Sequence, residues 1–201
     1  MVELADINRP VILASRSPRR REILSLMGIR FESMDPEVAD ENSYIDPRDL
    51  ENSLRRLAAA KAESIAQKHP RALVLGADTV VVKSAEIMGK PADRDEAAQT
   101  LRLLSGSQHT VITAVALVCG ETDFRESSAN RTTVSFRNLS EAEIDAYLSL
   151  EEYKDKAGSY AIQGRAMTFV DKIDGCYYNV VGLPVTATLS LLKQFVRKEF
   201  N

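Results

Sequence analysis

The chain has little of what metal-binding, secreted or membrane-spanning proteins usually need. It contains two cysteines and two histidines among 201 residues, and Cys119, Cys176, His69 and His109 show none of the close spacings typical of metal ligands. It lacks a run of about 18 apolar residues, which a membrane-spanning helix requires. Its N-terminus lacks the long apolar segment of a secretory signal peptide. We therefore expect a cytoplasmic protein with reduced thiols and no membrane partner.

The chain also lacks an excess of either charge. Its 26 Lys and Arg and 29 Asp and Glu residues give a net charge of −3. A protein that binds nucleic acid polymers would show a basic excess over the whole domain, so we expect no such partner. No repeat, long linker or low-complexity segment divides the sequence. The length therefore predicts one domain over residues 1–201, with a core of about residues 10–197.

The apolar patterns predict an α/β fold. Strands are expected at residues 11–14, 31–34, 72–82, 109–119 and 131–136, and helices at 18–27, 46–68, 93–105, 140–149 and from 184 onward. Hairpins are expected to join 80–82 to 87–88, and 169–173 to 176–181 about Asp174-Gly175. The simplest architecture is a mixed, twisted sheet with helices packed around it and a cleft between two lobes.

Residues 15–21, which follow the first predicted strand, indicate a phosphate site. The segment carries two hydroxyls and a cluster of arginines, with Ser17 at the N-cap of the next helix and Pro18 in its first turn. Free N–H groups at a helix N-terminus and the forked guanidinium group both suit phosphate oxygens. The alternative is a solvated charged face, which consecutive arginines often form.

Lys61 lies on the apolar stripe of the predicted helix 46–68, four residues after Leu57 and four before Ile65. One interpretation is that its side chain snorkels at the edge of the stripe. The other is that it lines a cleft. Both keep the charge in water or paired.

Asp78 interrupts the most apolar predicted strand, 72–82. Burying an unpaired carboxylate is costly, so we expect Asp78 at a strand end or bulge that faces a cleft, paired with a cation. Capping of a turn is the alternative. The predicted hairpin 80–88 returns the chain toward Asp78 and makes Lys90 a plausible neighbour.

Six motifs occur in a fixed order along the chain. They are Ser15-Arg16-Ser17-Pro18-Arg19-Arg20, Gly76-Ala77-Asp78-Thr79, Gly89-Lys90-Pro91, Leu104-Ser105-Gly106, Lys156-Ala157-Gly158-Ser159-Tyr160-Ala161-Ile162-Gln163-Gly164 and Val181-Gly182-Leu183-Pro184. In this order and spacing they resemble the Maf family of nucleoside triphosphate pyrophosphatases over nearly the whole chain. The resemblance implies an elongated mixed-sheet fold shared with the inosine-triphosphate pyrophosphatases, a central cleft, a divalent cation such as Mg²⁺ or Mn²⁺, and a homodimer.

The charges of a metal–triphosphate substrate explain which residues such a site needs. Cations bind the phosphates and carboxylates bind the metal. The phosphates would be held by Ser15, Arg16, Ser17 and Arg19, while Lys61 and Lys90 would neutralise charge that develops as pyrophosphate leaves. The resemblance gives Asp78 the role of proton acceptor for the attacking water and of metal ligand. It gives a second metal-binding role to the acidic loop 35–41, where Glu41 is the first choice and Asp40 the substitute.

The resemblance also implies the substrate branch. Arg19, Thr79 and Gln163 match the members that act on dTTP and UTP, and the Gln163 amide offers both a donor and an acceptor to a pyrimidine edge. We expect cleavage between the α- and β-phosphates, which gives the nucleoside monophosphate and pyrophosphate. Two alternatives stay open: a pyrophosphatase of 7-methyl-GTP or another modified nucleotide, and a regulator of cell division that binds nucleotides without hydrolysing them.

Overall fold

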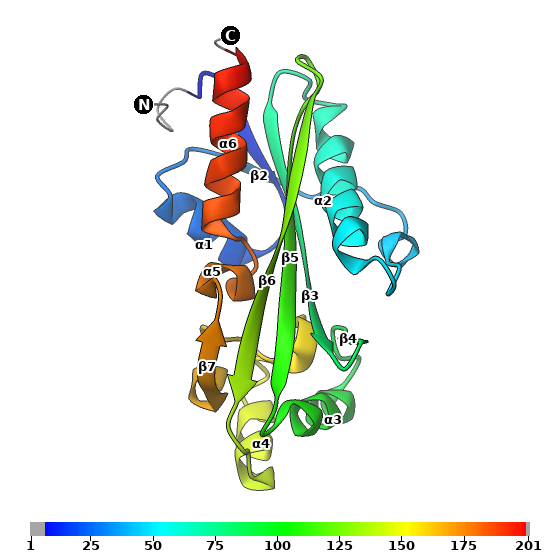
Figure 1. Ribbon diagram of the computed structural model, residues 1–201, viewed down its shortest axis with the longest axis vertical. Coiled ribbons are helices and arrows are strands. Elements are labelled where there is room, and N and C mark those ends of the chain that lie inside the picture. The colour runs from blue at the N-terminus through cyan, green and yellow to red at the C-terminus, as the bar shows by residue number, and fades with distance from the viewer. Residues whose placement is uncertain (1–6, 200–201) are drawn as a thin grey trace. The chain divides into compact units, whose positions relative to one another are not determined.

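The computed structural model describes residues 7–199 (Figure 1). Within these residues, seven strands form one mixed sheet in the order β2-β1-β3-β5-β6-β7, with β4 paired to β3. The strands are β1 (Val11–Ala14), β2 (Glu32–Met34), β3 (Leu73–Lys83), β4 (Glu86–Met88), β5 (Gln108–Cys119), β6 (Phe124–Phe136) and β7 (Val170–Asp174). The helices are α1 (Pro18–Leu26), α2 (Leu50–Ala66), α3 (Arg94–Leu104), α4 (Glu141–Leu148), α5 (Tyr177–Val181) and α6 (Val185–Glu199). The predicted α/β class with a mixed sheet is confirmed.

The chain divides into two compact units whose boundaries fall within β3, β5 and β6, and each unit is described by itself. The prediction of a single domain stays a prediction. No helix in the described part of the chain combines the length and the apolar character needed to cross a membrane. Both cysteines lie within residues 7–199, and neither forms a disulfide.

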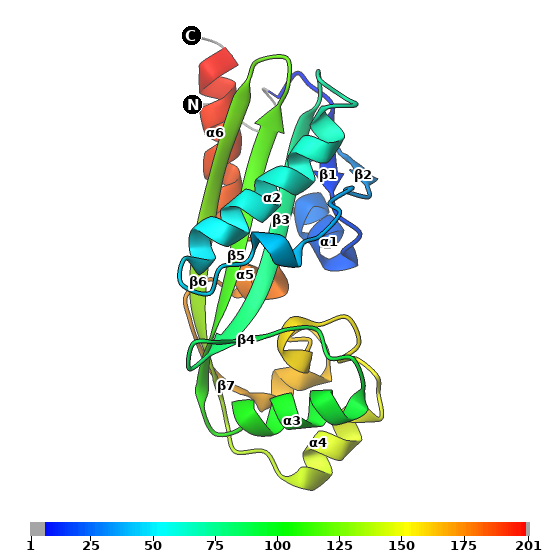
Figure 2. The same ribbon diagram turned by 90° about the vertical axis from the view of Figure 1, so that its right-hand side faces the viewer.

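The first unit contains the residues up to Asp78, Thr113–Asn130, and the residues from Gly182 onward. β1 pairs in parallel with both β2 and β3, and all four of its side chains are buried. In this unit α2 covers one face of the strands, and α1 and α6 cover the other (Figures 1 and 2). One cluster of its core is formed by Ile12, Ala14, Ala62, Ile65, Ala66, Ala72, Val74 and Val118. The small side chains in this cluster allow α2 to lie close to the strands.

Gly76 in β3 lies in close contact with the backbone of α2. A Cβ atom added to Gly76 would lie 2.1 Å from the carbonyl oxygen of Ala58 and 2.9 Å from the amide nitrogen of Ala62. Real Cβ atoms do not come this close to backbone, so no other residue fits here without moving the helix.

The second unit contains Thr79–Ile112 and Arg131–Val181. Its helices α3 and α4 pack against each other (Figure 2). β4 pairs with β3 in the predicted hairpin, with Met88 opposite Val81. The N-terminus of α4 has the capping box that Ser140 and Glu143 form.

His109 is buried among aromatic side chains of the second unit. Its Nε2 atom shares a 2.9 Å hydrogen bond with the hydroxyl of Tyr160. The rings of Phe136 and Tyr160 pack edge-on against the imidazole, with centroid distances of 4.9 and 5.4 Å. Burial lowers the pKa of His109 to about 4, and the positive charge of Lys83 adds to the shift.

The predicted hairpin about Asp174-Gly175 is wrong. β7 pairs with β6 instead, and residues 177–181 form the short helix α5. The turn is fixed by Thr132, whose Oγ1 accepts the Cys176 N–H at 3.0 Å and donates to the Cys176 carbonyl at 3.1 Å. The β-branched residues of this segment suggested a strand, but these tertiary hydrogen bonds override that preference.

Three predicted boundaries also differ from the structure. Helix α2 begins at Leu50 rather than near Asp46, because the Asp46 carboxylate accepts the Arg48 N–H at 2.9 Å and forms a turn before the helix. β6 starts at Phe124, before the predicted residue 131. The prediction missed the first part of this strand because that part is polar and half-exposed and shows no alternation of apolar and polar residues. Asp78 lies inside β3 rather than at its end, although the pairing of β3 with β1 stops at Gly76.

Replacing Gly76 with alanine should destabilise the protein. The added methyl group would overlap backbone atoms of α2, and overpacking of this kind costs about 1–3 kcal/mol. Urea unfolding of Gly76→Ala should show that loss. Gly89→Ala is the matched control, because a Cβ there meets nothing within 4 Å. Equal stability of the two variants would contradict the close approach.

Acid should destabilise the protein through His109. The unfolded histidine binds a proton near pH 6.5, whereas the folded one excludes it down to about pH 4. The free energy of unfolding should therefore fall by up to about 3 kcal/mol as the pH drops through this window. Unfolding curves at pH 7 and 4.5 should show a smaller pH effect in His109→Phe than in wild type. The exposed His69 provides the control, since His69→Phe should keep the wild-type dependence.

Candidate active site

Lys61 joins two carboxylates in the first unit. Its Nζ atom lies 2.8 Å from Glu41 Oε2 and 2.7 Å from Asp78 Oδ1. The Lys61 side chain is only 8% exposed, compared with 17% for Asp78 and 50% for Glu41. The snorkelling interpretation of Lys61 is therefore wrong, because the ammonium is buried and paired. Asp78 is paired with a cation, as predicted.

The local structure explains why these groups meet. Side chains alternate along a strand, so Asp78 points to the same face as Gly76, the face that α2 covers. Lys61 lies on α2 between Ala58 and Ala62, whose backbone touches Gly76. The close approach at Gly76 thus brings the lysine of α2 to the carboxylate of β3.

Glu41 and Asp40 have different surroundings. Glu41 directly precedes the 3₁₀ helix Asn42–Tyr44 and reaches Lys61. Asp40 binds within its own loop, where its Oδ1 accepts the Asn42 N–H at 3.1 Å. Glu41 therefore faces the lysine, and the assignment of Glu41 as a metal ligand stays a prediction.

The predicted phosphate loop lies between β1 and α1. Ser17 occupies the N-cap position and Pro18 begins the helix, as predicted. The Ser17 side chain makes no capping hydrogen bond to any described residue. The buried Ser15 Oγ accepts the Ser17 N–H at 3.2 Å. A helix N-terminus of this kind can bind an anion through its N–H groups.

Arg20 connects three parts of the first unit. Its guanidinium donates to the carbonyls of Ala77 and Gly182, both at 2.9 Å, and to Ser15 Oγ at 3.3 Å. Burial lowers the pKa of Arg20, and the charge of Asp78 opposes that shift. Sequence reasoning did not assign Arg20 to the site, because three consecutive arginines give no sign of which one turns inward.

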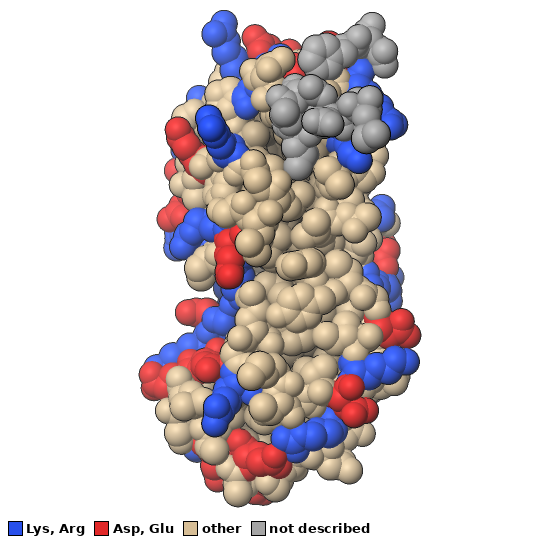
Figure 3. All heavy atoms as spheres, turned by 90° about the vertical axis from the view of Figure 1, so that its left-hand side faces the viewer, with Lys and Arg blue, Asp and Glu red and all other residues tan. Residues whose placement is uncertain are grey.

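The two predicted arginines, Arg16 and Arg19, differ in exposure. Arg16 is 78% exposed and forms an ion pair of 2.9 Å with Asp35. Arg19 is partly buried, and this burial lowers its pKa. Their roles in phosphate binding stay predictions. On the face drawn in Figure 3, Lys and Arg lie among Asp and Glu, in keeping with the small net charge.

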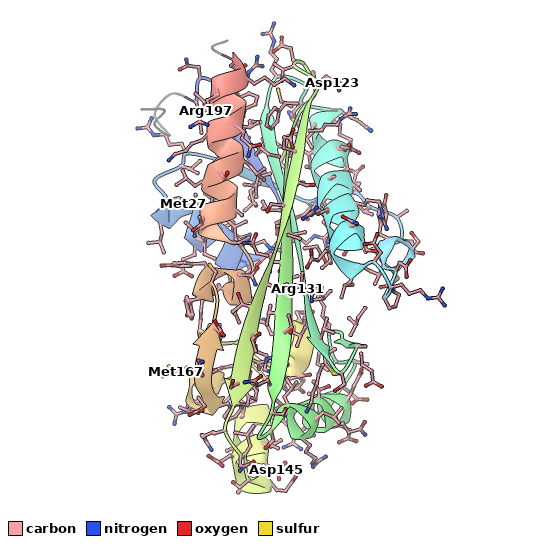
Figure 4. The ribbon with its side chains drawn as sticks, in the orientation of Figure 1. Met27, Asp123, Arg131, Asp145, Met167 and Arg197 are labelled. Atoms are coloured by element: carbon pink, nitrogen blue, oxygen red, sulfur yellow. The ribbon has the colours of Figure 1, made fainter. Side chains whose placement is uncertain are left out.

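Thr79, Lys90 and Gln163 belong to the second unit. Thr79 is half-buried in β3, and Lys90 is exposed after β4. Gln163 lines a shallow cavity of about 280 Å³ together with Ile162, Met167, Val170, Ile173 and Tyr177. Met167, which is 61% exposed, lies at the outer edge of this unit beside β7 (Figure 4). The cavity thus combines one amide with apolar walls, a composition that small-molecule sites commonly have.

The carboxylates of Glu41 and Asp78 fit a divalent cation that is shared with a substrate. Mg²⁺ is commonly held by one or two carboxylates together with phosphate oxygens and water. Within residues 7–199, no three His, Cys, Asp or Glu side chains gather into a site that could hold a metal. Phosphate oxygens would therefore have to supply part of the coordination.

Comparison with known proteins adds independent information. The family described as Maf-like protein matches residues 10–195. The dTTP/UTP pyrophosphatase of Bacillus anthracis is 46% identical over 188 residues, which cover 93% of this chain and 96% of that protein. The dTTP/UTP pyrophosphatase of Bacillus mycoides shows the same identity and coverage. The solved Ham1 protein of Staphylococcus aureus matches 95% of this chain and 100% of its own with a TM-score of 0.50 at 9% identity, a likeness of fold alone.

Double-mutant cycles should show which of the two ion pairs of Lys61 has the larger coupling energy. We expect a coupling of about 1–3 kcal/mol between Lys61→Met and Asp78→Asn, because both groups are largely buried. The coupling with Glu41→Gln should stay below about 1 kcal/mol, since Glu41 is half-exposed.

The control pair is Lys68, which lies just after the end of α2, and Glu37; it has a 2.7 Å contact but is exposed on both sides. Its coupling should be close to zero. A Lys61–Asp78 coupling no larger than that of the control pair, measured by urea unfolding, would contradict the buried ion pair.

Proposed function

The chain belongs to the Maf-like protein family, and on that premise we propose that it hydrolyses dTTP and UTP to the nucleoside monophosphate and pyrophosphate. The proposal rests on one observation above all, the convergence of Glu41 and Asp78 on Lys61. Two carboxylates and a cation in one place are what a reaction between water and a metal-bound triphosphate requires. The names of the relatives that are 46% identical support the same reaction.

The phosphates would bind at the start of α1. The N–H groups of its first turn, the hydroxyls of Ser15 and Ser17, and the guanidinium of Arg19 would bind their oxygens, with Arg16 contributing from a more exposed position. Arg20 supports this loop, because it binds Ser15 and the carbonyl that precedes Asp78. Glu41 and Asp78 would hold a divalent cation jointly with the phosphates. When bound, the cation would offset the negative charge of the phosphate oxygens.

Asp78 would accept the proton of the attacking water. Its bond to Lys61 fixes one carboxylate oxygen and therefore the direction of the other, which is the positioning that general-base catalysis needs. Lys61 also contributes a positive charge next to the reacting phosphates. Lys90 would neutralise the charge that develops on the leaving pyrophosphate.

Gln163 would select the base. A uracil or thymine ring presents a carbonyl next to an N–H, and one carboxamide can satisfy both. The apolar walls around Gln163 suit a flat ring. Thr79 and Arg19 are the other two residues that, by resemblance, match the family members that act on dTTP and UTP.

The same proposal indicates a cellular role for the enzyme. Removal of excess or modified pyrimidine nucleotides would give it a house-cleaning role. The cytoplasmic location and the homodimer stay predictions, and light scattering on the purified chain would test the second.

Incubation with each nucleoside triphosphate and with 7-methyl-GTP, in the presence of Mg²⁺ or Mn²⁺, tests the proposal. We expect monophosphate and pyrophosphate from dTTP and UTP above all others. Asp78→Asn should lower kcat by about 10²- to 10⁴-fold, because it removes the proton acceptor, while nucleotide binding persists. Glu37→Gln, which changes an exposed carboxylate of the same unit, should keep full activity.

Three results would contradict the proposal in different ways. Nucleoside diphosphate and phosphate as products would exclude α–β cleavage. A preference for 7-methyl-GTP would place the chain in another branch. Binding without turnover under either metal would favour a nucleotide-binding regulator.

A further inference from the structure

Gln163 lies in a tight turn of the second unit. The Gly164 N–H donates to the Ala161 carbonyl at 2.9 Å, which closes the turn around Ile162 and Gln163. Ile162 is buried, whereas Gln163 is exposed. The turn therefore presents one amide side chain outward from an anchored base.

Side chains from elsewhere in the unit bind the backbone at the start of this turn and just after it. The hydroxyl of Tyr147, a residue of α4 that is 2% exposed, accepts the Ala161 N–H at 3.1 Å. Just after the turn, Glu152 Oε2 accepts the Arg165 N–H at 2.7 Å. The Ala161 N–H, at the start of the turn, and the Arg165 N–H, directly after it, are thus both bound to side chains from elsewhere in the unit.

Tyr160, the residue before the turn, is fixed in the same way. Its hydroxyl shares the 2.9 Å hydrogen bond with His109, and its ring packs edge-on against Phe136 at 4.9 Å. Burial raises the pKa values of both phenols, that of Tyr147 to about 12, so both stay protonated at neutral pH. Neutral phenols keep these hydrogen bonds over the whole physiological range.

The backbone before Tyr160 has an unusual conformation. Gly158 and Ser159 both have left-handed φ angles, +71° and +61°. The Gly158 N–H donates to the Gly89 carbonyl at 3.1 Å, and a Cβ on Gly158 would meet the Val81 side chain at 2.9 Å. A serine keeps such a φ angle only where the surroundings impose it, so this segment is held in one conformation.

We propose that Tyr147 and Tyr160 are positioning residues for base selection, which hold the turn at 161–164 so that Gln163 is presented in one fixed orientation. The proposal rests on the proposed function, because it takes Gln163 to contact the base. A pre-organised amide loses less conformational entropy on binding than a mobile one. The two phenols therefore raise the affinity for pyrimidine nucleotides without touching them.

The test compares Tyr147→Phe and Tyr160→Phe with Gln163→Ala and with wild type. Each phenylalanine keeps the ring and removes one hydroxyl. We expect KM for UTP to rise about threefold to tenfold in each phenylalanine variant and to rise further in Gln163→Ala. The kcat of each phenylalanine variant should stay within about twofold of the wild-type value. The rate with GTP should not change, so the preference for UTP over GTP should fall by the same factor. Tyr153→Phe is the matched control, since Tyr153 is a buried tyrosine of the same unit that makes none of these contacts.

Hydrogen exchange at the Ala161 and Gly164 amides gives a readout that needs no substrate. Both amides should exchange faster in Tyr147→Phe and keep the wild-type rate in Tyr153→Phe. A merely structural role would lower the rates with UTP and GTP together, and that result would overturn the proposal. An unchanged UTP preference would overturn it too, even with faster exchange. If wild type hydrolyses no UTP, the proposed function fails first, whereas UTP turnover with an unchanged preference removes this proposal alone.

Discussion

The bond between the Lys61 ammonium and the Asp78 carboxylate is the interaction on which the site depends. A charge that is mostly removed from water must be paired, and here each group is the partner of the other. The pair exists because Gly76 lets the backbone of α2 come into contact with β3. One missing side chain in the strand therefore decides the distance between a lysine and a carboxylate that lie on different elements. Glu41 then joins from a loop, at lower energetic cost because it is half-exposed.

The rest of the first unit supports the same place. The arginine that turns inward, Arg20, binds the carbonyl of Ala77 next to Asp78 and the hydroxyl of Ser15 at the start of the anion-binding loop. The N-terminus of α1 and the paired carboxylates thus share one support. The charged groups of this site are brought together by the close contact of α2 with β3 and by the hydrogen bonds of the Lys61 and Arg20 side chains. This arrangement suits a reaction whose catalysis consists mainly of positioning and charge stabilisation.

The sequence predicted the parts of the structure that depend on local patterns. The β1–α1 unit, the stripe of α2, the β3–β4 hairpin and the helix predicted at 140–149 follow from periodicity and end signals, and the structure has them. Prediction from the sequence failed where residues distant in the sequence determine the local conformation. The helix at 177–181 depends on Thr132, and the inward turn of Arg20 depends on Gly182, neither of which lies near in sequence. For Lys61 the sequence left two interpretations open, snorkelling at the edge of the stripe and lining a cleft, because only the fold reveals its partners.

Direct observation of the Lys61 ammonium group in solution would test the central claim best. In ¹⁵N-labelled protein, a paired and buried NH₃⁺ group exchanges its protons slowly enough to give its own NMR signal, unlike the exposed lysines. We expect a signal that disappears in Lys61→Met, shifts strongly in Asp78→Asn and shifts less in Glu41→Gln. A Lys61 ammonium that exchanges as fast as the exposed Lys90, or one that ignores the loss of the Asp78 charge, would contradict it.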